Sequence, residues 1–258
     1  MDSLIVETTN HCQLSCPFCV RDKLTRAKGV MTDEIFERAI SEAVESKVTT
    51  IFPYYFGEPF LDKKIYERCQ YILSKGLRVN LFTNLGIPID ENKISMLKGA
   101  TGIVISYAPG ADPEVRDRNI EILRREKFVI VMHVVDENAL VVPANTIGRK
   151  YDIKVERFEK TNWHGVIHCP GPVKDGRCIR PLEELVILQD GTISLCCMDY
   201  DGEIQFGNIM NTSLEEAWKK AKPYRVLPKS KLPFCQKCNM AVLEDYPKWV
   251  QDLFHEDD

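Results

Sequence analysis

Three cysteines near the N-terminus are the residues whose type and spacing point most directly to chemistry. Cys12, Cys16 and Cys19 form a C-x3-C-x2-C pattern. Their thiolates can hold three corners of one inorganic centre, and the loop offers no fourth thiolate. In a four-iron, four-sulfur cluster held this way, one iron keeps no protein ligand and can bind a small molecule. Because structural metal sites close their coordination whereas catalytic sites keep a position open, the pattern indicates catalysis. A structural zinc held by these thiolates and His11 is the alternative interpretation, since the spacing also suits zinc.

A second set of cysteines lies in the C-terminal third of the chain. Its members come from three segments, and the last two form a C-x2-C pair: Cys178, Cys196, Cys235 and Cys238. Four thiolates that converge would make a closed site, which holds either a second iron–sulfur cluster or a zinc ion. Either metal would supply folding free energy to a region that is too small for a core of its own.

The three remaining cysteines have weaker signals. Cys69 lies on a predicted helix and is interpreted as a small buried hydrophobe. Cys197 follows Cys196 directly, and on a strand its side chain would point to the other face. Cys169 lies in a linker, where a labile ligand, a thiol that contacts substrate and a bystander all stay open.

Composition places the chain among soluble globular proteins. Its 258 residues are 44% hydrophobic and 28% charged, which suits one large α/β domain or one with an appendage. The net charge of −4 and the isoelectric point near 5.8 give no general reason to expect nucleic acid as a partner. The apolar runs are too short to span a membrane, and no secretory signal precedes them. We therefore expect a reducing cytoplasmic location, where clustered cysteines favour metal binding or catalysis over disulfides.

The elements that must position these residues alternate along the first 160 residues. Predicted strands cover 4–8, 48–54, 78–83, 102–107, 128–135 and 153–158. Amphipathic helices are expected after the N-cap Thr32 and over 63–75, 90–97, 113–125 and 139–150. Six strand–helix units imply a parallel sheet with right-handed crossovers, two fewer than a closed TIM barrel needs. The pattern alone fits both an open doubly wound sheet and a curved partial barrel.

The regular alternation of strands and helices ends after residue 158. A linker covers 164–180, and strands over 185–188 and 192–196 flank a turn at Asp190-Gly191 that predicts a hairpin. A short helix over 214–220 is capped by Thr212 or Ser213, and a last helix is expected over 243–254. We therefore divide the chain into a barrel domain, 1–163, and a C-terminal domain, 164–258.

On these motifs the N-terminal part resembles the radical S-adenosylmethionine (SAM) enzymes. Phe18 stands just before the last cysteine of the loop, as in that family. The resemblance implies a set of cofactor-binding residues at the ends of the loop and of the second, third and fourth strands: Phe18, Gly57, Glu58, Pro59, Thr83, Asn84 and Ser106. Two positions depart from the family pattern. Phe56 stands where many members carry glycine, and Leu85 separates Asn84 from Gly86.

The C-terminal part resembles the shortened SPASM module known as a twitch domain. The spacing from Cys178 through Gly191 to Cys196 fits its C-x(9–15)-G-x4-C pattern. The resemblance implies one auxiliary [4Fe-4S] cluster, hence two [4Fe-4S] clusters with SAM. It also implies the architecture: a partial (β/α)6 TIM-like barrel with a small twitch domain built of a β-hairpin plus a helix.

The resemblance further implies an activity. In the family, SAM bound to the open iron is cleaved to a 5′-deoxyadenosyl radical, which abstracts hydrogen from substrate. The short twitch architecture is similar to that of radical-SAM aminocyclitol dehydrogenases, so we expect an oxidoreductase that oxidises an alcohol of a small polar molecule, with the auxiliary cluster as electron acceptor. Such a reaction needs a base, for which the candidates are His133, Arg157 and His164. A buried core role is the alternative for His133, and an ion pair with Glu156 or Glu159 is the alternative for Arg157.

Two other functions stay open on the sequence. Many SPASM relatives mature ribosomally made peptides, usually with an extra N-terminal recognition domain, and the first strand here begins at about residue 4. A non-catalytic, zinc-stapled binding protein is a hypothesis of another class. A flavodoxin or ferredoxin-type reductant is an expected partner. Six basic residues could form its docking surface, although such a run is usually a solvated face: Lys219, Lys220, Lys222, Arg225, Lys229 and Lys231.

Overall fold

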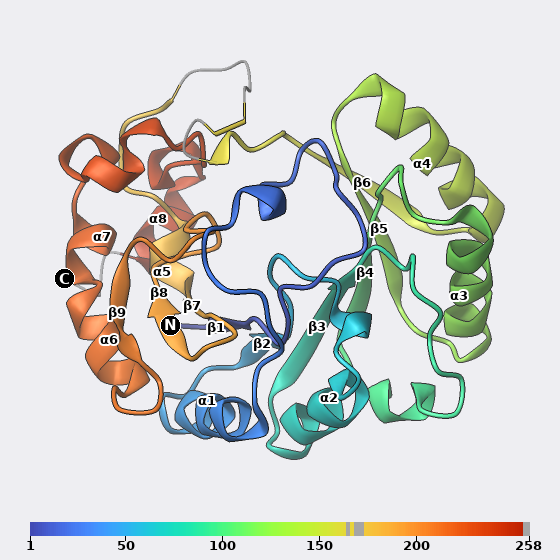
Figure 1. Ribbon diagram of the computed structural model, residues 1–258. Helices are drawn as coiled ribbons and strands as arrows, with labels where there is room; N and C mark the ends of the chain where they lie inside the picture. Colours follow the sequence, from blue (N-terminus) through green and yellow to red (C-terminus); the bar gives the residue numbers. More distant parts are fainter. Residues whose placement is uncertain (164–165, 168–172, 255–258) are drawn as a thin grey trace.

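The computed structural model describes residues 1–163, 166–167 and 173–254. Its framework is a nine-stranded sheet with the order β6-β5-β4-β3-β2-β1-β7-β8-β9, which curves around a central space in Figure 1. Six strands pair in parallel, each with the next along the chain: β1 (Ser3–Val6), β2 (Thr50–Phe52), β3 (Arg78–Thr83), β4 (Gly102–Ser106), β5 (Ile130–Val135) and β6 (Lys154–Phe158). All six predicted strands are present, and the partial barrel is confirmed.

Helices cover the outer face of this sheet: α1 (Asp33–Glu45), α2 (Ile65–Ser74), α3 (Pro113–Arg125) and α4 (Asn138–Tyr151). Thr32 caps α1 as predicted, because its hydroxyl accepts a hydrogen bond from the Ile35 amide at 3.3 Å. Between β3 and β4 the sequence predicts a helix over 90–97, but only a short 3-10 turn forms, η3 (Ile94–Leu97). The Asp90 carboxylate accepts the Asn92 amide at 3.0 Å, and such local turns compete with helix formation.

Alternation along the strands separates an outer from an inner face. Leu4 and Val6 of β1 pack in the large core beneath the helices, whereas Ile5 packs with Val186 and Leu188 in a separate inner cluster. Phe52 of β2, Phe82 of β3 and His133 of β5 continue this face as a row of rings. The barrel interior therefore carries apolar and aromatic side chains, with a few polar ones such as Ser106 among them.

The C-terminal region continues the same sheet. Strand β7 (Glu184–Ile187) pairs in parallel with β1, and β8 (Thr192–Ser194) and β9 (Gln205–Asn208) follow in antiparallel order. The predicted hairpin is therefore confirmed, with Gly191 in the left-handed conformation at its turn (φ +88°). Strand β9 was not predicted. The division at residue 163 stays a prediction, and the sheet and the hydrophobic core run across it.

Short helices complete this region: α5 (Arg180–Glu183), α6 (Leu214–Lys220), α7 (Lys222–Val226) and α8 (Lys248–Leu253). Ser213 caps α6, since its hydroxyl accepts the Glu216 amide at 3.2 Å. The single last helix predicted over 243–254 is wrong. It is divided into a 3-10 turn, η7 (Leu243–Asp245), and α8, because Pro247 between them cannot continue a helix. Throughout the described part of the chain, no helix has the length and apolar character that a bilayer crossing requires.

Candidate active site and second cysteine centre

The first cysteine loop follows β1 and lies across the opening of the barrel (Figure 1). Cys12, Cys16 and Cys19 are all partly exposed. Burial raises the pKa of all three thiols, that of Cys16 to about 11, and the charges of Cys19 and Cys12 add to this effect at Cys16. Without a metal the thiols therefore hold their protons at neutral pH. A bound cluster would supply the positive charge that stabilises three thiolates together.

Gly57 and Glu58 hold this loop against the end of β2. The Glu58 amide donates to the His11 carbonyl at 2.8 Å. A Cβ at Gly57 would lie 2.0 Å from the Thr9 carbonyl oxygen, so no larger residue fits without displacing the backbone. The glycine is needed for close approach of two loops.

The Glu58 side chain then joins the ends of β2 and β3. It is 1% exposed, and its two oxygens accept hydrogen bonds from the Thr83 hydroxyl (2.6 Å), the Asn84 amide (2.8 Å) and the Phe60 amide (3.2 Å). Burial raises its pKa to about 7, and the three hydrogen bonds oppose that shift. Both oxygens are engaged within the protein, so Glu58 acts here as a frame for the site.

Asn84 connects that frame to the cysteines. Its Nδ2 lies 3.7 Å from Cys12 Sγ, and its Oδ1 accepts from Gln13 Nε2 at 2.8 Å. The residue after it, Leu85, has φ +53°, and its amide donates to the Thr83 hydroxyl at 2.9 Å. Pro59 opens the 3-10 turn η2 (Pro59–Leu61) that returns the chain to the outside of the barrel. Gln13 was not predicted as a site residue. Only its position inside the cysteine loop indicated that it would lie at the site.

Phe56 belongs to an aromatic group that contacts the cysteine loop at the backbone of Phe18. The Trp163 indole N–H donates to the Phe18 carbonyl at 3.0 Å, and the Phe56 ring lies 5.2 Å from Trp163 and 6.3 Å from Tyr200 between centroids. Phe56, which replaces a glycine of the family pattern, therefore fills the space between the loop and the C-terminal region.

The inner face of the barrel carries a row of rings that ends at the candidate base His133. Phe82 stacks on Tyr54 at 4.5 Å and lies 5.4 Å from His133, which lies 4.6 Å from Phe158. Ser106 of β4 is the register partner of His133 on β5. Burial lowers the pKa of His133, partly offset by a contact of 3.1 Å between its Nε2 and Glu156 Oε2. The imidazole is therefore neutral at pH 7 and can accept a proton.

The other two candidate bases are not brought to this row. Glu156 and Phe158 of β6 contact His133, so Arg157 between them points to the opposite face. Arg157 is exposed and pairs with Asp136 at 3.7 Å rather than with Glu156 or Glu159. His164 lies outside the described residues, as does Cys169.

The second cysteine set is buried throughout. Cys178, Cys196, Cys235 and Cys238 are between 4% and 7% exposed. A bridge from Cys178 to Val242 and the 3-10 turn η6 (Pro233–Lys237) position three of them. Burial raises the pKa of Cys178 to about 11 and that of Cys235 to about 12, and the charges of other cysteines of the set add to both shifts. Three segments thus bring the four thiols within reach of one another's charge, although no three of them are arranged around a single metal ion in the described residues.

Two of the cysteines outside these sets can be compared with their predictions. Cys69 is fully buried on α2, as predicted. Cys197 lies in a turn after β8 rather than on a strand, and it packs both on the inner cluster with Ile5 and on the large core that contains Cys196; its amide donates to Glu184 Oε1 at 3.2 Å. Within the described ranges, no group of three or more His, Cys, Asp or Glu side chains is arranged to hold a single metal ion.

The basic run near the C-terminus is only partly a surface. Lys229 is 1% exposed, and Arg225 is 8% exposed with its guanidinium over the Trp218 ring at 4.1 Å. The interpretation of the whole run as a solvated face is therefore wrong for these two residues, because both are packed inside the C-terminal region.

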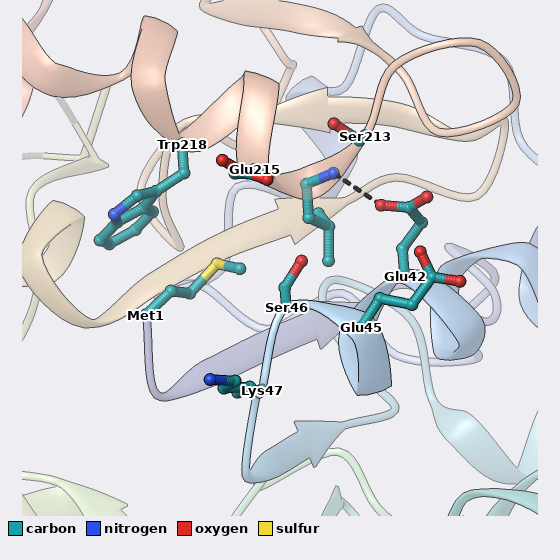
Figure 2. A pocket seen from close by; sticks show the side chains of 9 residues that line it. Met1, Glu42, Glu45, Ser46, Lys47, Ser213, Glu215 and Trp218 are labelled. Carbon is teal, nitrogen blue, oxygen red and sulfur yellow. Dashed lines mark hydrogen bonds between the residues drawn. The ribbon is translucent and has the colours of Figure 1, made fainter.

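A surface cavity of about 320 Å³ lies at the other end of the barrel, between the C-terminus of α1 and the start of α6 (Figure 2). Met1, Ser46 and Trp218 line it, and the Glu42 carboxylate there accepts the Leu214 amide at 3.0 Å. In barrels of this kind the amino ends of the strands serve stability, whereas chemistry sits at the carboxyl ends. The cavity is thus separate from the cysteine loop.

Comparison with known sequences matches residues 178–239 to the SPASM family, an iron–sulfur cluster-binding domain. This segment contains the whole second cysteine set. A curated relative, the PqqA peptide cyclase of Gluconobacter oxydans (strain 621H), is 30% identical over 102 residues. The match covers 38% of this chain and only about a quarter of that relative, 27% of its length.

Solved structures match over nearly the whole chain. BtrN in complex with AdoMet and 2-DOIA superimposes with a TM-score of 0.68 at 18% identity, covering 93% of this chain and 94% of that one. Streptococcus suis SuiB bound to precursor peptide SuiA gives 0.70 at 13% identity, covering 92% and 69%. anSMEcpe with bound AdoMet gives 0.65 at 13% identity, covering 87% and 83%. The chain therefore has the partial-barrel fold of the radical SAM enzymes and carries a SPASM iron–sulfur cluster-binding domain in its C-terminal part.

Proposed function

We propose that this chain is a radical SAM oxidoreductase that oxidises an alcohol group of a small polar substrate. The observation that carries the proposal is the convergence of the cysteine loop, Gly57-Glu58 and Thr83-Asn84 at the carboxyl ends of β1, β2 and β3. When bound there, a [4Fe-4S] cluster with SAM supplies a 5′-deoxyadenosyl radical that removes hydrogen from a C–H bond.

The residues of the first site would hold the cluster and SAM in different ways. Cys12, Cys16 and Cys19 would bind three irons. Asn84, beside Cys12, would present its amide to the ligand of the open iron. Glu58 fixes Asn84 through its backbone amide, so it serves positioning rather than chemistry.

The barrel interior would exclude water and move a proton. The rings of Tyr54, Phe82 and Phe158 line the approach to His133. Oxidation of a secondary alcohol to a ketone releases a hydrogen atom, a proton and an electron. Neutral His133 would take the hydroxyl proton, and Glu156 would stabilise the imidazolium that forms.

The second cysteine set would complete the redox balance. Cys178, Cys196, Cys235 and Cys238 would hold one further [4Fe-4S] cluster, which supplies an acceptor for the electron when bound. Tyr55 follows β2 and packs on the inner cluster, and its hydroxyl donates to the Cys196 carbonyl at 3.3 Å, so it links this cysteine to the barrel interior. The fold match to BtrN, which spans nearly all of both chains, supports this architecture. We place the activity in the cytoplasm with a flavodoxin or ferredoxin-type reductant, because free thiols and clusters persist in a reducing compartment.

A second candidate function is modification of a precursor peptide. The sequence match to PqqA peptide cyclase and the fold match to SuiB bound to precursor peptide SuiA favour it. Both functions would use the same first site, and they differ in the substrate that reaches the barrel interior and in the bond that is changed there.

Anaerobic purification followed by SAM cleavage tests the proposal. We expect about eight irons per chain and 5′-deoxyadenosine on addition of SAM and dithionite. Polar alcohols deuterated at the carbinol carbon should pass label into 5′-deoxyadenosine, and a label that arrives only from peptides would favour the second candidate. A colourless, zinc-containing protein that does not cleave SAM would contradict both functions.

The variant His133→Asn tests the proposed base. We expect ketone formation to fall by about 10²- to 10⁴-fold, while 5′-deoxyadenosine is still produced without substrate oxidation. The matched control is Arg157→Gln, whose side chain lies on the opposite face and should leave ketone formation unchanged. An unaltered rate in His133→Asn would exclude this base.

A further inference from the structure

A buried lysine adjoins the second cysteine set. Lys229 is 1% exposed and is among the largest fully buried side chains of the described residues. Its ammonium donates to the carbonyl oxygens of Cys238 at 3.0 Å and Met240 at 2.8 Å, and its own amide donates to the Gly176 carbonyl at 2.9 Å. The cation is thus held beside the chain segment that carries one of the four cysteines.

No carboxylate forms an ion pair with this cation among the described residues, although its charge reaches Asp175 and Asp245 and, after their hydrogen bonds from Ser230 and Lys174, lowers the pKa of both. Asp175 accepts hydrogen bonds from the amides of Gly176 and Ser230, both at 2.9 Å, and Asp245 pairs with Lys174 at 2.7 Å. A buried ammonium without a compensating negative charge is strongly unfavourable. Two neutral carbonyl oxygens supply hydrogen bonds but no net charge.

Lys229 also contacts two of the segments that carry the cysteines. Its ammonium donates to the Cys238 carbonyl at 3.0 Å, and its amide donates to the carbonyl of Gly176, two residues before Cys178, at 2.9 Å. A negative charge on a group held by these cysteines would therefore stabilise the buried cation.

We propose that Lys229 is the internal counter-charge of the iron–sulfur cluster held by Cys178, Cys196, Cys235 and Cys238, and that it raises the reduction potential of that cluster. The inference rests on the proposed cluster at these cysteines. A cluster with four thiolate ligands gains one negative charge when it accepts one electron. A fixed cation in a poorly polarisable interior favours the more negative, reduced form. Lys229 thus acts through the cluster, as a positioning residue, and makes electron transfer out of the substrate more favourable.

The variants separate charge from packing and from hydrogen bonding. Lys229→Met keeps the aliphatic stem, Lys229→Gln keeps a donor for the carbonyl oxygens, and Lys229→Arg keeps the charge. Lys237→Met is the matched control. Lys237 lies between Cys235 and Cys238 but is exposed, so its loss changes the net charge equally while solvent and salt screen the effect.

The measurement is a redox titration at fixed pH, followed by electron paramagnetic resonance. It uses the full chain with Cys12, Cys16 and Cys19 changed to Ala, so that only the second cluster contributes. We expect Lys229→Met and Lys229→Gln to raise the oxidised-to-reduced ratio at a given potential at least tenfold, which is a shift of 59 mV to more negative potential for a one-electron couple. Lys229→Arg and Lys237→Met should each change that ratio less than threefold.

An unchanged potential in Lys229→Met and Lys229→Gln with about four irons retained would overturn the inference. Loss of the cluster from both uncharged variants but not from Lys229→Arg would support it, whereas loss from all three would assign Lys229 to packing alone. Failure of the proposed function looks different, since the unaltered chain would then contain no iron or would pass no label from a deuterated alcohol, whatever the potential of the second cluster.

Discussion

The two cysteine sets use the same ligand atom in opposite surroundings. The first set lies on one partly exposed loop and offers three thiols. The second set is buried, draws on three segments of the chain and offers four. An incomplete, accessible set suits a site that must bind another molecule, whereas a complete, buried set suits one that must not. Under the proposed function, ligand number and burial together would separate the reactive centre from the one that accepts an electron.

The two sets also differ in what holds them in place. The first loop is fixed by the protein, through the Glu58 amide on the His11 carbonyl and Asn84 beside Cys12. The second is built from short turns and a single bridge, with little regular structure between Cys235 and Val242. We expect the protein to order the first centre and the metal to order the second.

Changing Cys12, Cys16 and Cys19 together to Ala should have the largest effect on catalysis. Half of the iron should be lost, from about eight to about four per chain, and 5′-deoxyadenosine should fall to background. Thermal stability should change little, because the loop is held by other contacts. Iron analysis with chromatography of the nucleoside checks this, and retained SAM cleavage would break the assignment of the first set.

Changing Cys235 and Cys238 to Ala should give the converse result. SAM cleavage should persist, oxidised product should disappear, and the folded state should lose about 3 kcal/mol or more, a fall of roughly 6–12 °C in melting temperature. Calorimetry under anaerobic conditions measures it. Equal losses of stability from the two cysteine sets would remove the distinction between a protein-ordered and a metal-ordered centre.

Gly57→Ala should disturb the first site alone. Its Cβ would meet the Thr9 carbonyl at 2.0 Å, so the cysteine loop must shift, and a displacement near 1 Å costs about 10²-fold in rate. The matched control is Gly110→Ala, whose Cβ would make only an ordinary contact of 3.6 Å with Leu14. SAM cleavage rates compare the two, and similar rates would show that the loop tolerates movement.

Glu58→Gln should have the smallest effect on catalysis. Its effect on the free energy of unfolding should depend on pH. Burial raises the pKa of Glu58 in the folded state to about 7, so the stability it contributes is present below its ordinary pKa near 4.5 and is lost as the pH rises through 7. Between pH 5 and 8 the unaltered chain should therefore lose up to about 3 kcal/mol relative to Glu58→Gln.

Unfolding by urea at several pH values measures this difference. Glu67→Gln is the control, because Glu67 is exposed, pairs with Lys93 at 2.6 Å and has a lowered pKa, so its difference curve should be flat over the same range. A flat curve for Glu58→Gln as well would mean that the buried carboxyl is ionised throughout.

The strands and the two cysteine sets were predictable because their signals are local. β-Branched runs marked β1 to β6, and fixed spacings marked the cysteines. Strand β9 gave no such signal, since Gln205 to Asn208 contains one apolar residue and its path depends on Gly207 (φ +132°) against Thr212. The face of β6 on which Arg157 lies could not be predicted from the sequence either. It follows from the contacts of Glu156 and Phe158 with His133.

Burial of charge was the least predictable property of the site. Lys229 has the same sequence surroundings as its exposed neighbour Lys231, and only the folded loop distinguishes them. Gln13 likewise belongs to no motif, and its hydrogen bond to Asn84 exists only because the loop after β1 reaches past β2 to the end of β3. Long-range contacts of single residues therefore set the limit of what spacing and periodicity reveal.

The pairing of β1 with β7 has a consequence for how the chain is made. Ser3 pairs with Glu184 and Val6 with Ile187, so one edge of the first strand has no partner until about 180 further residues have been synthesised. Until then that edge is a template for mispairing with other chains. Because pairing over such a distance is also slow, this edge of β1 stays open to mispairing until β7 has been made and has docked.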